Sequence, residues 1–203
     1  MTNPAKENEV IGNFIKAFSL DTLQERKAGF AKVLAETYGK MKDNNSQAIW
    51  LGRVYELKKE HTNVDLFNWG LAHYKAGNNI VADSIFAKYT ERYPTNIFGY
   101  YWRAQVNAAI DTTLELALAV PYYKKVVELG EPDKQANKPM LLKAYGYLGG
   151  YEANITKDYP ASLDWFEKFL ELDPENADAN RYSKLLKEWI NDPKKNKEKS
   201  TDG

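Results

Sequence analysis

The sequence predicts an all-α protein built from repeated helical hairpins. Residues 65–94 contain two segments whose apolar residues recur at helical spacing, and Gly77-Asn78-Asn79 separates them. Ala104 follows Gly70 at a spacing of about 34 residues, so a small residue recurs at the interval expected between neighbouring hairpins. No segment shows the period-two alternation of a half-buried β-strand. These three observations favour a stack of helices in which each hairpin covers the apolar side of the next.

Composition narrows the function classes. The chain has 203 residues and 43% hydrophobic content, which is enough for a packed core. Its 28 basic residues balance 28 acidic ones, so it lacks the excess positive charge expected of a nucleic-acid binder. No apolar run approaches the roughly 20 residues of a membrane span. The absence of cysteine excludes disulfides, thiol nucleophiles and thiolate metal sites.

The N-terminal half is expected to begin with a capping helix over residues 6–18, which carries an apolar stripe but has no hairpin partner of its own. Residues 22–61 read as a degenerate first hairpin, because Ala48 precedes Ala82 by the same interval that separates Gly70 from Ala104. The hairpin of residues 65–94 follows, and Pro94 stops its second helix.

The next hairpin is expected over residues 97–132. Pro121 would cost about 3 kcal/mol inside a helix but little in a first turn. We therefore expect the second helix to begin close to Val120, with residues 114–118 forming a separate turn or a kinked lead-in.

The last hairpin is expected over residues 140–174. Leu148-Gly149 supplies the small residue for close helix packing, and Ser162 supplies its counterpart. The two halves of this hairpin disagree in register by one residue, so an extra residue is expected between them. A final helix over residues 176–190 has the polar outer face that ends an open stack. The charged segment that follows has nothing to bury and is expected to be disordered.

Gly70, Gly77, Ala82, Phe86 and Pro94 together resemble the tetratricopeptide repeat, a helix–turn–helix of about 34 residues. This resemblance implies a right-handed α-solenoid of about ten helices. The segment IDTTLELALAVPYYKKVVELG, residues 110–130, is also similar to a bacterial subgroup often found in exported or envelope-associated proteins, which favours a periplasmic or envelope location over a cytoplasmic one. We expect three parts: an N-terminal tail and capping helix at 1–20, a repeat domain at 21–191 and a disordered charged tail at 192–203. Within the repeat domain, the expected repeats are 22–61, 63–94, 97–132 and 140–174, followed by a capping helix at 176–190.

The sequence offers no catalytic constellation. His61 and His73 are its two histidines, and His73 falls on the packing face of its helix. No ligand spacing for a metal, no nucleophile signature and no phosphate-binding glycine loop occurs. We therefore expect no enzyme activity, no cofactor and no metal.

The resemblance implies that the first helix of each repeat lines a concave surface that binds a protein or peptide segment. The residues expected on this surface are Phe67, Leu71, Tyr74, Phe98, Tyr101, Gln105, Tyr147 and Tyr151. Aromatic residues at helical spacing more often pack in a core, so packing is the competing interpretation at each position. Relatives that clamp a C-terminal carboxylate use Lys and Asn where this chain has Phe67 and Leu71, so such tails are not expected as ligands.

Two other interpretations remain open at this stage. The chain could be a structural adaptor or oligomerisation unit that uses its convex or end surfaces, with its groove filled by the helix of residues 6–18. It could also be an accessory domain of an envelope-associated assembly.

Overall fold

The structure, a computed structural model, describes residues 4–192, and these contain ten α-helices and no β-strand. The all-α fold class is thus confirmed. The chain divides into two compact units, Met1–Ile110 and Asp111–Gly203. Residues 1–3 of the predicted N-terminal tail and 193–203 of the predicted charged tail lie outside the described residues.

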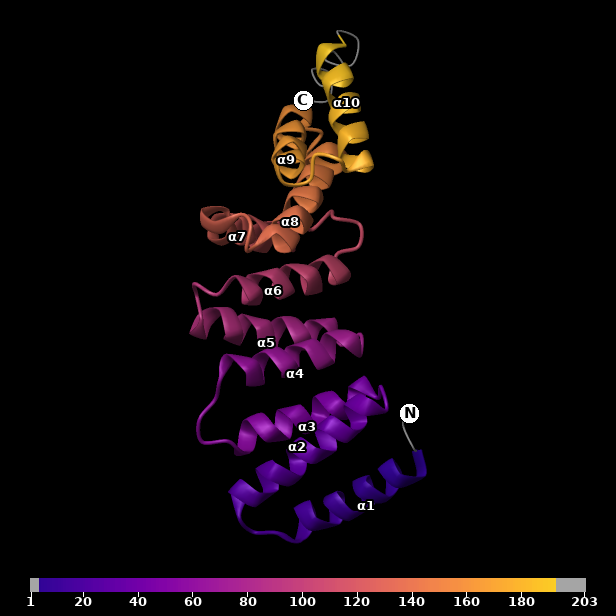
Figure 1. The fold of residues 1–203 in the computed structure, drawn as a ribbon, viewed down its shortest axis with the longest axis vertical. Coiled ribbons are helices and arrows are strands. Elements are labelled where there is room, and N and C mark those ends of the chain that lie inside the picture. The colour runs from indigo at the N-terminus through magenta and orange to yellow at the C-terminus, as the bar shows by residue number, and fades with distance from the viewer. Residues whose placement is uncertain (1–3, 193–203) are drawn as a thin grey trace. The chain divides into compact units, whose positions relative to one another are not determined.

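The first unit is a series of helices in which each packs against the next (Figure 1). They are α1 (Pro4–Leu20), α2 (Gln24–Lys40), α3 (Asn44–Leu57), α4 (Asn63–Lys75), α5 (Asn79–Arg92) and α6 (Ile97–Ile110).

Close approach of α4 and α5 depends on Gly70. A Cβ atom at this position would lie 2.9 Å from the ring of Phe86, which is fully buried. Gly77 closes the turn between the two helices with φ of 78°, a conformation that glycine adopts without strain. The side chain of Thr62 caps α4 in a reciprocal capping box with Asp65. The local residue types therefore account for where this hairpin begins, turns and packs.

Helix α1 packs against the α2–α3 hairpin through aromatic edges. The ring of Phe14 lies 5.8 Å from that of Phe30, and the ring of Phe18 lies 5.1 Å from that of Trp50. These contacts cover the first hairpin from the side of α2 that carries Phe30.

The second unit contains four α-helices and two short helical turns (Figure 1). They are α7 (Val120–Gly130), η1 (Glu131–Asp133), α8 (Lys138–Tyr151), η2 (Glu152–Thr156), α9 (Tyr159–Leu172) and α10 (Ala177–Asn191). The predicted start of α7 at Val120, with Pro121 in the first turn, is confirmed. The carboxylate of buried Asp111 accepts a hydrogen bond from the backbone N–H of Leu118, which closes the turn that precedes α7.

The extra residue predicted between α8 and α9 is accommodated by η2, a single π-helical turn. The α8–α9 seam otherwise repeats the packing seen between α4 and α5. A Cβ at Gly149 would lie 2.9 Å from the ring of Phe166, and the buried Ser162 hydroxyl donates to the Gly149 carbonyl at 2.8 Å. The same glycine–phenylalanine contact thus recurs in both units.

Candidate functional site

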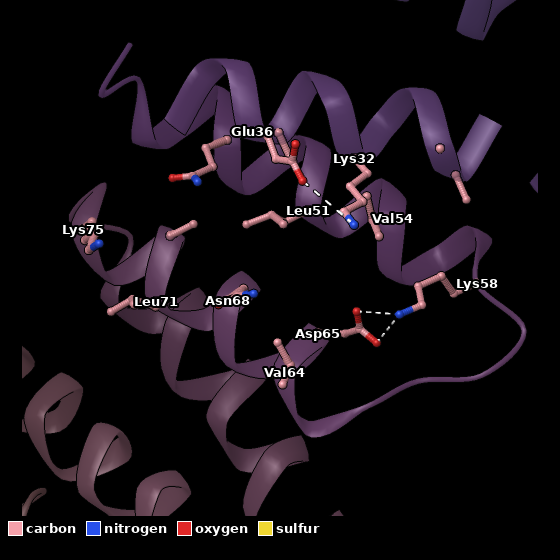
Figure 2. Close-up of a pocket in the computed structure, with 15 residues that line it drawn as sticks. Lys32, Glu36, Leu51, Val54, Lys58, Val64, Asp65, Asn68, Leu71 and Lys75 are labelled. Carbon is pink, nitrogen blue, oxygen red and sulfur yellow. Dashed lines mark hydrogen bonds and ion pairs between the residues drawn. The ribbon is translucent and has the colours of Figure 1, made fainter. Parts of the chain in front are cut away.

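A groove of about 630 Å³ lies between α2 and α4, with α3 behind it (Figure 2). We call it the α2–α4 groove. Leu51 and Val54 on α3 and Val64 and Leu71 on α4 line it with apolar side chains. Val64 is 56% exposed although it is apolar. The groove therefore offers a solvent-exposed apolar surface of the kind that a side chain of a partner could cover.

One end of the α2–α4 groove is fixed by a charged pair. The ammonium of Lys58 lies 2.7 and 2.6 Å from the two carboxylate oxygens of Asp65. Partial burial raises the pKa of Asp65, but hydrogen bonds from Lys58 and Thr62 outweigh burial and hold that pKa below its usual value. The charges of Lys58 and Asp65 thus neutralise each other, and Asp65 also fixes the N-terminal end of α4 through its bonds to Thr62.

The other polar side chains of this groove have weak partners or none among the described residues. The ammonium of Lys32 is 4.0 Å from the Glu36 carboxylate, a weak exposed pair. Asn68 and Lys75 project from α4, and no described residue bonds their side chains. Figure 2 shows Lys75 at the end of the groove opposite the Lys58–Asp65 pair. Hydrogen-bond donors are thus available to a ligand along the α4 side.

The corresponding space between α4 and α6 is filled by Trp102. Its ring lies 6.0 Å from that of Phe67, 5.7 Å from that of Tyr74 and 6.3 Å from that of Phe86. Phe67 and Tyr74, which the sequence places on the concave surface, thus contact a tryptophan of the same unit. Leu71 is the member of that predicted set that lines the α2–α4 groove.

The predicted residues on α6 lie around Trp102. Tyr101 packs its ring edge-on against Trp102 at 5.8 Å, and its hydroxyl accepts a hydrogen bond from Gln105 at 2.8 Å. Phe98 is 50% exposed. These side chains lie near one another on α6 but line neither of the grooves described in this section.

A second groove of about 510 Å³ lies in the second unit between α8 and α10, with α9 behind it. We call it the α8–α10 groove. Phe169, Tyr182 and Trp189 give it aromatic walls, and Gly146 and Gly150 give it a flat side on α8. A Cβ added to Gly150 would meet nothing within 4 Å.

Tyr147 and Tyr151, the predicted residues on α8, do not line the α8–α10 groove. The ring of Tyr147 lies 4.5 Å from that of buried Tyr123 on α7. Burial and the nearby Asp111 carboxylate raise the pKa of Tyr147 to about 12. Its hydroxyl is buried and has no hydrogen-bond partner in the described part of the chain. Tyr151 is half-buried at the end of the same helix.

Both histidines belong to one aromatic run between α3 and α4. Tyr55 stacks on His61 at 4.1 Å and on Trp69 at 5.3 Å, and the ring of His73 lies 6.2 Å from that of Trp69. Burial lowers the pKa of His73, which favours its neutral form. Within residues 4–192, no group of three or more His, Cys, Asp or Glu side chains could hold a metal ion, and no helix could cross a membrane.

Several groove residues were not identified from the sequence. Lys32 lies on α2, where the degenerate repeat obscures the register, and Leu51 and Val54 lie on a second helix rather than a first one. The role of Trp102 was also missed. Trp102 lies one repeat length after Asn68, and this spacing could have shown that the two side chains occupy equivalent positions facing neighbouring spaces.

Comparisons with known proteins bear on the fold. No family model and no curated protein matches the sequence. The C-terminal part of a TPR repeat-containing protein from Cytophaga hutchinsonii matches with a TM-score of 0.72 and 25% identity, over 85% of this chain and 65% of that one, so this chain spans just under two thirds of it.

Two further structures have the same fold at lower identity. The MamA RS-1 ArsTM double mutant matches with a TM-score of 0.63 and 18% identity, over 82% of this chain and 86% of that one. YrrB, described as a TPR protein with an unusual peptide-binding site, matches with a TM-score of 0.62 and 14% identity, over 89% of this chain and 86% of that one.

Proposed function

We propose that this tetratricopeptide-repeat protein is a non-catalytic interaction module that binds a segment of a partner protein in the α2–α4 groove. The observation that carries the proposal is the combination of an apolar surface with polar groups that have no partner among the described residues. Leu51, Val64 and Leu71 supply the apolar surface, and Asn68 and Lys75 supply the donors. An extended or helical peptide uses both kinds of contact.

The neighbouring space between α4 and α6 supports this choice by contrast. Asn68 projects into the α2–α4 groove, and Trp102, at the equivalent position one repeat later, fills the next space with its own ring. A groove that the chain fills itself has little apolar surface left for a ligand. The predicted residues on α4 and α6 are therefore a secondary candidate surface of the first unit, with Leu71 common to both, whereas Tyr147 and Tyr151 belong to the second unit.

The contrast also supplies a blocking variant. Asn68→Trp should fill the α2–α4 groove as Trp102 fills the next space, and it replaces an exposed side chain without a described partner. Asn13→Trp is the matched control, because Asn13 is an exposed helical asparagine on α1. Gly150→Trp fills the α8–α10 groove, where an added Cβ meets nothing.

The test is selection of random peptides displayed on phage against the wild-type protein, followed by binding of each selected peptide to the three variants. We expect Asn68→Trp to abolish binding, and Asn13→Trp and Gly150→Trp to preserve it, with helical circular dichroism unchanged in all. Selected peptides that bind Asn68→Trp as well as the wild type would refute this groove. Peptides lost only with Gly150→Trp would transfer the function to the α8–α10 groove.

The adaptor interpretation has one observation in its favour. Leu20 and Leu23, at the turn between α1 and α2, are 72% and 55% exposed, and Ile15 nearby on α1 is 41% exposed. An apolar corner of this kind could contact a second molecule. If it does, sedimentation velocity should show concentration-dependent association that Leu20→Glu abolishes. No residue of α1 lines the α2–α4 groove, so the two interpretations can be tested separately.

A further inference from the structure

The α2–α4 groove continues into a second hollow at the C-terminal ends of α2 and α4. This hollow has a volume of about 640 Å³ and shares Glu36, Gln47 and Lys75 with the groove. Lys40, the last residue of α2, and Lys42, in the turn that follows, also line it. An extended ligand in the groove would therefore pass from an apolar surface to a cluster of ammonium groups.

The charge of this combined surface differs from that of the chain as a whole. Five lysines line the groove and the hollow, against two carboxylates, whereas the formal net charge of the chain is zero. Lys58 is paired with Asp65, and Lys32 lies near Glu36. The ammonium groups of the other three have no partner among the described residues; they are Lys40, Lys42 and Lys75.

The backbone at Lys42 adds a second observation. Its φ is 61°, in the left-handed region where a residue with a Cβ is disfavoured and glycine is usual at a helix C-terminus. The chain uses glycine with φ of 78° at the comparable turn after α4, at Gly77. A lysine is thus present at the lysine-lined hollow where the backbone alone favours glycine.

We propose that the partner segment of the α2–α4 groove is an acidic amphipathic peptide, with apolar residues over Leu51, Val64 and Leu71 and adjacent Asp or Glu residues beside Lys42 and Lys75. This inference rests on the proposed function and specifies the chemistry of the ligand. The lysines are exposed, so each contact is modest and screened by salt. The apolar part supplies most of the affinity, and the acidic part sets direction and selectivity.

The alternative explanation is structural. Lysines at helix C-termini interact favourably with the helix dipole, and Lys40 and Lys75 are the last residues of α2 and α4. That role would be visible in the stability of the protein but not in its preference among ligands. The experiment must therefore measure both quantities.

The probes are three fluorescein-labelled peptides with the same alternating leucine and alanine segment. The first ends in Glu-Asp-Glu, the second in Gln-Asn-Gln and the third in Lys-Arg-Lys. All carry a C-terminal amide, so that no terminal carboxylate contributes. Binding is measured by fluorescence anisotropy between about 0.05 M and about 0.5 M salt, a range over which exposed charge pairs become screened.

We expect the acidic peptide to bind about ten-fold more tightly than the neutral one at low salt, with this preference lost at high salt, and the basic peptide to bind weakest. Substituting all three unpaired lysines by glutamine should weaken binding of the acidic peptide about ten-fold and leave the neutral peptide unaffected. A matched triple substitution at exposed lysines outside both hollows should change neither; this control is Lys16→Gln, Lys143→Gln and Lys184→Gln.

Lys42→Gly separates ligand binding from folding. Glycine relieves the left-handed backbone, so the urea midpoint should not fall, whereas the affinity for the acidic peptide should drop. A lower midpoint with unchanged peptide binding would show a structural lysine and overturn the inference.

The remaining outcomes distinguish the two proposals. Equal binding of acidic and neutral peptides, both lost with Asn68→Trp, would overturn the acidic preference and leave the groove function standing. Binding of none of the peptides, together with failure of the phage selection, would refute both. Displacement of the acidic peptide by a short polyuridine at comparable concentration would show general attraction of anions and overturn the assignment to a peptide.

Discussion

Substitution of Gly70 by alanine is the most direct test of how the hairpins pack. The added Cβ would lie 2.9 Å from two carbon atoms of the Phe86 ring and 3.2 Å from a third, whereas ordinary contacts begin near 3.4 Å. Phe86 is fully buried, so its ring cannot move toward solvent. Overpacking of this kind costs about 1–3 kcal/mol. Alanine also favours the helical conformation over glycine by about 1 kcal/mol, so the net loss in the free energy of unfolding should be about 0–2 kcal/mol.

Gly12→Ala provides the reference that removes the propensity contribution. Gly12 is an exposed residue of α1, and a Cβ there would meet nothing within 4 Å. Its substitution should raise stability by about 0.5–1 kcal/mol. The difference between the two variants, about 1–3 kcal/mol, then reports the contact with Phe86 alone.

Urea unfolding followed by circular dichroism gives both values if the unfolding slope is unchanged between variants. Gly149→Ala should repeat the loss in the second unit, because its Cβ would lie 2.9 Å from the ring of Phe166. If Gly70→Ala stabilises the protein as much as Gly12→Ala does, the close glycine–phenylalanine seam is absent and the hairpin packing described above is wrong.

Three further predictions concern polar groups in these seams, each measured by urea unfolding. Burial lowers the pKa of His73 in the folded protein, so below the unfolded pKa of about 6.5 the unfolded chain binds a proton that the folded protein does not. The free energy of unfolding should therefore fall between pH 7 and pH 5. His73→Phe should make it less dependent on pH over this range. Tyr145→Phe should cost about 1 kcal/mol of stability, because the Tyr145 hydroxyl donates a hydrogen bond to Glu131 at 3.1 Å. Tyr147→Phe should be neutral or stabilising, because it removes a buried hydroxyl that has no partner among the described residues. Equal losses of stability in the two variants would contradict this prediction. Thr62→Ala should cost about 1 kcal/mol by removing the cap of α4, and no loss would show that the capping box is not formed.

The fold could be predicted from the sequence because it depends on local signals that repeat. Small residues at a fixed interval mark where helices approach, as at Gly70, and proline in a first turn marks where a helix begins, as at Pro121. A one-residue disagreement in register predicted an extra residue in the last hairpin, but not that a π-helical turn over residues 152–156 would accommodate it. Each of these features constrains a backbone that has few alternatives.

The candidate site could be predicted only in part. The sequence identifies which residues project from a first helix, and Leu71 was found in that way. It does not show whether a projecting ring meets a ligand or a neighbour, because that depends on side-chain volume across the space between repeats. Phe67 and Tyr74 contact Trp102, and Tyr147 contacts Tyr123, so periodicity alone could not distinguish packing from exposure.

Whether a space between first helices of the first unit is open or filled can be traced to a single repeat position. Asn68 and Trp102 are one repeat length apart and occupy equivalent places on α4 and α6. The short amide of Asn68 leaves the α2–α4 groove open, and the indole of Trp102 fills the following space against Phe67 and Tyr74. The backbone repeats while this side chain changes, so the two hairpins share a fold and differ in the space that they leave between first helices. A repeat fold can therefore be recognised without its ligand site, and in this chain the proposed site depends on the volume of one side chain in each repeat.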